Sequence, residues 1–265
     1  MKKIIYFVTL LFIVGMTGCK SDPPVTVSST DAWAPKVGDY FKYNVYDLDS
    51  FGIRVLKSKT TREWKVTKIG QEFQGLKNVS IIDETLTDTT NTPKSSLVYL
   101  STPLDGKVYQ YAALNPLVTR FAPIAPFADS IPKSWLLLND FKSVAGFNWL
   151  GQATSKFNVT FPAPAGLTSI ELTDSAFSKG KIGVTVPLST YATSIHVDHK
   201  VKIMVKPSIL PTAIPLDDLT FSSDGDITNG FYKFKFDSKM IIVPGIGEFF
   251  IPGYEMELVD LKKGS

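Results

Sequence analysis

The chain has two histidines, which lie three residues apart around a carboxylate: His196, Asp198 and His199. Two imidazoles and a carboxylate are ligands that zinc accepts in proteins. The neighbouring residues alternate between apolar and polar, as in a strand, and positions three apart on a strand point to opposite faces. A helical His-Glu-x-x-His site would instead bring both rings to one side. The segment therefore favours a polar hairpin turn between two strands, and we expect neither a metal nor a cofactor.

Oxygen-bearing side chains at alternate positions follow Asp224, as at the start of a calcium loop. An EF-hand loop needs glycine at its sixth position and glutamate at its twelfth. Counted from Asp224, glycine falls seventh, at Gly230, and the twelfth residue is Lys235. Asp and Asn side chains also cap the backbone of tight turns, where glycine takes positive φ. The stretch therefore predicts a turn rather than a calcium site.

The sequence carries no motif of a catalytic nucleophile or of a nucleotide site. The Gly-x-Ser-x-Gly elbow, the Walker loop and the dinucleotide fingerprint are all missing from it. A Ser-His-Asp triad would have only the two neighbouring histidines to draw on. We therefore expect a protein without enzymatic activity. A hydrolase that uses two carboxylates stays open as an alternative, because any two of the 25 acidic residues could meet in space.

The one cysteine, Cys19, ends a segment typical of secretion signals. Lys2 and Lys3 come first, residues 4–14 are apolar apart from Thr9, and small residues surround Met16 before Cys19. The apolar run is too short to cross a bilayer, which takes about 20 apolar residues. A lone cysteine cannot form a disulfide within its own chain. Its place at the end of the apolar run is where lipid attachment would occur.

Met16-Thr17-Gly18-Cys19 resembles the lipobox of bacterial lipoproteins, although that family prefers leucine where Met16 stands. The resemblance implies cleavage before Cys19, a diacylglycerol on its sulfur and an acyl chain such as palmitate on its amine. The protein would then be held to the membrane through N-terminal acyl chains. In this family Asp after the cysteine marks retention at the inner membrane. Lys20 therefore resembles the outer-membrane class, and the leaflet that the protein faces stays open.

Cleavage would leave 247 residues, 265 minus 18, with 26 basic and 25 acidic side chains and a net charge of about +1. No basic stripe with interleaved aromatic residues occurs, so we expect no nucleic-acid partner. Pro and Ser residues after Cys19 cannot bury enough apolar surface to become ordered. We therefore divide the chain into a signal peptide (1–18), a flexible tether (19–36) and one β-rich domain (37–265), whose folded part begins near Trp33.

Alternation with a period of two predicts many short strands in the domain. The clearest alternating stretches are 41–46, 64–69, 97–100, 108–111, 157–161, 197–205 and 231–236. Asp105-Gly106 lies between two of them and predicts a hairpin. We expect an all-β fold with a strongly curved antiparallel sheet, either a half-barrel or sandwich-like.

The segment from 115 to 132 has four prolines among apolar residues, which excludes a central strand or a long helix. Ser134 can cap a short helix that runs to about residue 141. We expect this loop and helix to form a lid over an apolar ligand, with Phe121, Phe127 and Trp135 in contact with it. The alternative is a loop that only covers the open end of a core.

Trp33-x-Pro35-x-x-Gly38-x-Tyr40 and Pro244-Gly245-Ile246-Gly247 resemble a loose group of cell-envelope lipoproteins. That group is similar to the curved half-barrel of lipoprotein-carrier and localisation factors, which implies a bent sheet around an apolar pocket. No binding residue can be transferred from it. The first hypothesis is accordingly a lipoprotein that binds an apolar ligand or a partner segment. There are two alternatives. One is a protein that captures glycans with exposed aromatic rings, which burial of all four tryptophans would contradict. The other is a hydrolase.

Overall fold

The computed structural model of the chain describes residues 33–103, 105–112, 131–161, 166–243 and 247–265. These residues are almost entirely β-structure, and their one helical element is a short 3-10 turn, Leu56–Ser58. No helix in this part of the chain is long and apolar enough to span a membrane. The all-β class expected from the alternating pattern is therefore confirmed.

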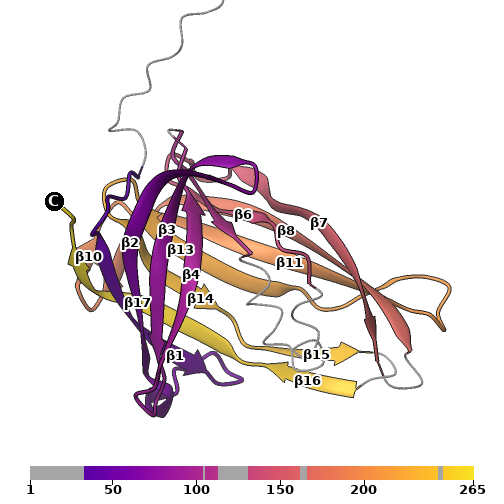
Figure 1. Cartoon of the computed structure of the whole chain (residues 1–265). Helices are drawn as coiled ribbons and strands as arrows, with labels where there is room; N and C mark the ends of the chain where they lie inside the picture. Colours follow the sequence, from indigo (N-terminus) through magenta and orange to yellow (C-terminus); the bar gives the residue numbers. More distant parts are fainter. Residues whose placement is uncertain (1–32, 104, 113–130, 162–165, 244–246) are drawn as a thin grey trace, which may run out of the picture.

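Most of the strands belong to one antiparallel sheet of thirteen strands, shown in Figure 1. Its path runs β6-β5-β4-β3-β2-β1-β17-β14-β13-β11-β8-β7, and β12 pairs with β11 beside it. The strands of this path are β1 (Tyr40–Leu48), β2 (Thr60–Phe73), β3 (Leu76–Thr87), β4 (Pro93–Ser101), β5 (Lys107–Tyr111), β6 (Trp135–Asp140), β7 (Asn148–Thr160), β8 (Leu167–Lys181), β11 (Ile195–Pro207), β13 (Leu219–Asp226), β14 (Gly230–Phe236) and β17 (Gly253–Lys262). Two short hairpins complete the fold: β9 (Val184–Val186) with β10 (Ser189–Tyr191), and β15 (Lys239–Val243) with β16 (Gly247–Ile251). The strand β12 is Ile214–Pro215.

The sheet is strongly bent, because its register shifts at several bulges. Such shifts occur in β2 between Val66 and Phe73, and in β7 between Leu150 and Ser155. In Figure 1 the strands β2, β3 and β4 stand across the direction of β7, β8 and β11. The end strand β6 contacts β7, β11 and β13 as well as its ladder partner β5. The two ends of one continuous sheet therefore fold towards each other around a shared core, as the predicted curved sheet requires.

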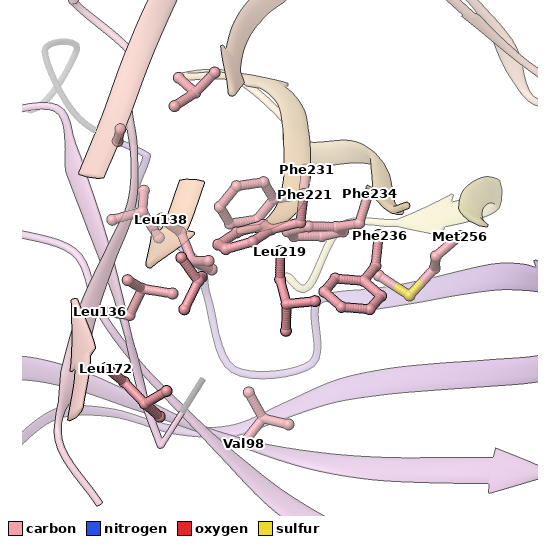
Figure 2. Close-up of a cluster of buried hydrophobic side chains, with 14 of the residues drawn as sticks. Val98, Leu136, Leu138, Leu172, Leu219, Phe221, Phe231, Phe234, Phe236 and Met256 are labelled. Atoms are coloured by element: carbon pink, nitrogen blue, oxygen red, sulfur yellow. The ribbon is translucent and has the colours of Figure 1, made fainter. Parts of the chain in front are cut away.

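The core fills the space between these two halves of the sheet. Figure 2 shows Leu138 of β6 close to the rings of Phe221 and Phe231, with Phe234, Phe236 and Met256 continuing the row. Each of these side chains is at most 8% exposed. On β14 the side chains of Tyr232, Phe234 and Phe236 are buried, whereas Lys233 and Lys235 are only partly buried, as the alternation of the sequence predicted. Burial of this many large side chains is the main force that holds the bent sheet closed.

Trp33 lies within the predicted tether, at the point where the sequence analysis placed the start of the folded part. Its indole is 3% exposed and packs edge-on against Phe41, Phe141 and Phe231. Gly230 leaves room for this ring, because a Cβ there would lie 2.5 Å from it. Trp33 is therefore part of the hydrophobic core.

Two of the predicted turns are confirmed. β4 and β5 pair antiparallel across Asp105-Gly106, and Gly106 has a φ of +91°. At the end of β13, the carboxylate of Asp226 accepts hydrogen bonds from the backbone N–H of Thr228 (2.8 Å) and of Asn229 (2.9 Å). The stretch that resembles a calcium loop is thus a capped turn that closes with Gly230 at a φ of +84°.

The predicted helix over residues 134–141 is wrong. The segment forms the strand β6, which pairs antiparallel with β5. All four residues from Leu136 to Asn139 are buried, so neither face of β6 shows the alternation that marks a half-exposed strand. A short apolar run buried on both sides has no period that separates strand from helix, and the pairing with β5 decides it.

Candidate functional site

A cavity of about 280 Å³ lies between the two halves of the sheet. We call it the inner cavity. Strands from both halves supply its apolar walls: Trp64, Val98, Leu136, Leu138, Phe221, Phe234 and Met256. Its volume is at the lower end of the range of small-molecule sites, which is about 300–1,000 Å³. A partly open space of this kind, with apolar walls and polar side chains beside them, suits a small ligand with an apolar body.

One group of polar side chains in the inner cavity is arranged around Glu84. Trp64 donates its indole N–H to Oε1 of Glu84 at 2.8 Å, and the Ser96 hydroxyl donates to Oε2 at 2.7 Å. The Nε of Arg62 lies 3.3 Å from Oε1. Strand register creates this group, because Glu84 lies opposite Trp64 on β2 and opposite Ser96 on β4. Arg62 is two residues from Trp64 and therefore points to the same face.

Of the three ligand-contacting residues predicted from the sequence, the structure describes one, Trp135, and it does not line this cavity. Trp135 is described, half-buried at the start of β6, and its indole N–H donates to the carbonyl of Gln74 at 3.1 Å. Its ring packs against Tyr111, with 5.3 Å between centroids, and does not line the inner cavity. Phe121, Phe127 and the lipid-attachment residue Cys19 lie outside the described residues. The next residue along β6, Leu136, lines the cavity instead.

The sequence analysis missed Arg62, Glu84 and Ser96. Each is a polar residue at an inward position of an otherwise ordinary strand, and nothing in its local pattern marks it. The one available signal was the alternation around Trp64, which identifies the inward face of β2. Which residues of β3 and β4 meet that face depends on the register of the neighbouring strands, which the local pattern does not give.

The histidine segment lies within the strand β11, so the predicted hairpin turn at 196–199 is wrong. His196 points outward. Its Nδ1 lies 2.8 Å from Oδ1 of Asp224, and its Nε2 lies 3.0 Å from Oδ1 of Asp198. The hydrogen bond with Asp224 raises the pKa of His196, although partial burial opposes this, and Asp198 adds to the increase. Lys179 pairs with the same Asp198 at 3.4 Å, so the ring lies in a paired surface network.

His199 points into the core, on the face opposite to His196, as expected for positions three apart on a strand. Its side chain and that of Asp174 are both fully buried, with Nδ1 2.9 Å from Oδ2 of Asp174. The Nε2 lies 2.8 Å from the carbonyl oxygen of Leu138. Because a carbonyl only accepts, Nε2 must carry a proton. The pair thus links β8 and β11 to the end strand β6.

Gly151 is required by this buried pair. A Cβ at position 151 would lie 1.8 Å from Oδ2 of Asp174.

The two histidines therefore have separate structural partners. Among the residues that the structure describes, no group of three or more His, Cys, Asp or Glu side chains is placed to hold a metal ion.

A second, more open cleft of about 1,040 Å³ is lined by residues of β7, β8, β11 and β13. Its lining includes Trp149, Phe177, His196 and Lys200. Several charged groups there are paired with one another; Lys235, for example, lies 3.0 Å from Asp237.

The structure also bears on the two alternative functions. Trp33 and Trp64 are buried, whereas Trp135 and Trp149 are half-buried on different strands. Several described carboxyls, those of Glu63, Asp88, Asp105 and Glu255, have lowered pKa values because hydrogen bonds and paired cations outweigh the opposing effect of burial. A general acid of a glycosidase needs a raised pKa instead.

No protein-family model matches the sequence, and the curated proteins contain no match to it. Among solved structures the fold is similar to that of a "putative lipoprotein from Parabacteroides distasonis ATCC 8503". The two are 11% identical in sequence with a TM-score of 0.45, over 88% of this chain and 99% of that one. A likeness at this level does not assign a function.

Proposed function

We propose that the protein is a lipid-anchored lipoprotein of the cell envelope, at the outer membrane, that binds a small apolar ligand or an apolar segment of a partner. The inner cavity is the observation that carries the binding role. Its walls come from both halves of the sheet, so the ligand would lie where the core is incomplete. The proposal includes no catalysis.

The anchor follows from the order of charge, apolar run and cysteine at the N-terminus. Two or three acyl chains, at about 0.8 kcal/mol for each buried CH₂, hold a protein stably in a bilayer. Cells fed labelled palmitate should label the wild-type protein, and Cys19→Ser should abolish the label. Met16→Leu, which restores the residue that the lipobox family prefers, is the control and should keep it. Label that persists in Cys19→Ser would contradict the anchor.

Binding in the inner cavity can be measured by calorimetry with decanol on the chain from Lys20 onward, which retains every described residue. Val98 lines the cavity and is 7% exposed. Val98→Phe should fill part of the space and weaken decanol binding about tenfold or more, which corresponds to about 1.4 kcal/mol.

The matched control is Val205→Phe. Val205 is similarly buried, at 3% exposed, but does not line the inner cavity. It should lose comparable stability from overpacking and keep its affinity for decanol. Absence of decanol binding by the wild-type protein, or equal effects of the two substitutions on affinity, would refute the proposed site.

A further inference from the structure

Arg62 lies at the polar end of the inner cavity with donors to spare. Its side chain is 24% exposed and lines the cavity. Its Nε is buried and has no hydrogen-bond partner. Within the described part of the chain, the guanidinium makes one hydrogen bond, from Nη1 to the sulfur of Met256 at 3.9 Å. A thioether is a weak acceptor, so most of the five N–H groups of Arg62 are left without a good partner.

Glu84 does not satisfy this guanidinium. Both of its carboxylate oxygens already accept hydrogen bonds, one from Trp64 and one from Ser96. Its contact with Nε, at 3.3 Å, is an ion pair without hydrogen-bond geometry. The Nη groups, whose one hydrogen-bond partner in the described part of the chain is the weakly accepting sulfur of Met256, therefore remain available to a ligand.

The other cation that lines the cavity is already engaged. Lys235 pairs with Asp237 at 3.0 Å, and both side chains are more than one-third exposed. Two cations and one carboxylate, Glu84, thus line the inner cavity, with Arg62 as the cation that has free donors. A planar guanidinium matches a carboxylate in geometry, because two parallel N–H groups meet two oxygens.

We propose that the inner cavity binds an amphipathic monocarboxylate, such as a medium-chain fatty acid, and that Arg62 holds its carboxylate. The alkyl chain would lie against Trp64, Leu136 and Phe234. The volume of about 280 Å³ fits a medium chain better than a long one. This inference depends on the proposed function, because it assigns the ligand class of the same cavity.

The test compares decanoate with decanol, which share an alkyl chain and differ in charge. Calorimetry on the chain from Lys20 onward, at about pH 7.5 where a carboxylate is ionised, should show decanoate bound about tenfold or more tightly than decanol. Arg62→Gln should remove this preference and leave the affinity for decanol unchanged, which also shows that the variant is folded. Lys65→Gln is the matched control: Lys65 is exposed on the opposite face of β2, outside the cavity lining, and its loss should keep the preference.

Arg62→Lys gives a second measure if Arg62→Gln does not fold. It keeps the charge without the two parallel donors, so its preference for decanoate should fall between those of the wild type and a neutral side chain. Equal binding of decanol and decanoate by the wild type, or an unchanged preference in Arg62→Gln, would overturn the assignment of Arg62 and leave the apolar cavity standing. Failure of both ligands to bind would overturn the cavity as well.

Discussion

Asp174 and His199 are the most deeply buried ionisable pair in the described core, and removal of Asp174 tests what they do. Both side chains are 0% exposed, and the ring also donates from Nε2 to the carbonyl of Leu138. In Asp174→Ala the Nδ1 of His199 loses its buried hydrogen-bond partner. We therefore expect β6 to lose part of its attachment to the rest of the sheet.

The expected cost follows from this burial. Deletion of one member of a buried pair typically lowers the free energy of unfolding by about 3–5 kcal/mol. A domain of this kind is held folded by roughly 5–15 kcal/mol in total. With a urea dependence of about 2 kcal/mol per molar, the unfolding midpoint should fall by roughly 1.5–2.5 M. Urea titrations followed by tryptophan fluorescence can measure this on the chain from Lys20 onward.

Two further variants separate burial from the loss of charge. Asp174→Asn keeps the shape and can donate from its amide to Nδ1, so it should cost only about 0.5–1.5 kcal/mol. Asp218→Ala removes the partner of Lys200, whose side chain is 63% exposed. That surface pair should contribute far less than the buried pair, because solvent screens it. If Asp174→Ala costs no more than Asp218→Ala, the reasoning about the buried pair is refuted.

Two other predictions follow from the geometry of the sheet. Gly151→Ala places a Cβ 1.8 Å from the buried carboxylate of Asp174 and should lower the free energy of unfolding about as much as deletion of that carboxylate. Gly183→Ala is the control: the nearest atom to its Cβ would be 3.8 Å away, so the free energy of unfolding should change by less than about 0.5 kcal/mol. Equal effects of the two substitutions in urea titrations would contradict the close contact. His196→Gln should destabilise the protein more at about pH 5.5 than at about pH 8.5. The hydrogen bond with Asp224 raises the pKa of His196, so the stabilisation is complete below the ordinary value of 6.5 and is lost as the pH rises through the folded-state value. A larger loss at the higher pH would contradict the sign of that shift.

The alternation of apolar and polar residues in the sequence was enough to predict most of the strands. Phe157, Val159 and Phe161 are buried on β7 and just after it, while Asn158 and Thr160 are exposed, as their alternation predicted. The same holds on β11, where the lysines that follow His199 face outward. A strand turns each successive side chain to the opposite face, so the sequence shows which residues are inward without knowledge of the partner strand.

The same alternation did not predict the structure where a strand is buried on both faces, or where a side chain's partner lies far away in the sequence. Residues 136–139 read equally well as helix or strand, and only their position next to β5 and over β11 and β13 makes them β6. The ring of His199 was expected in a turn because both histidines are polar residues in a short stretch. Its actual partners, Asp174 and the carbonyl of Leu138, lie 25 and 61 residues away.

The sequence by itself determined the all-β class, the inward face of most strands and the Asp-Gly and Asp226 turns, because each of these depends on residues within a few positions of one another. Cys19 as the lipid-attachment site stays a prediction from the sequence. The tertiary structure alone decided that Arg62, Glu84 and Ser96 meet at one end of a cavity, and that Phe234 and Met256 from the other half of the sheet wall it. These contacts depend on the register of several strand pairs and on the bulges that bend the sheet. A one-residue change in register would turn each of these side chains to the opposite face.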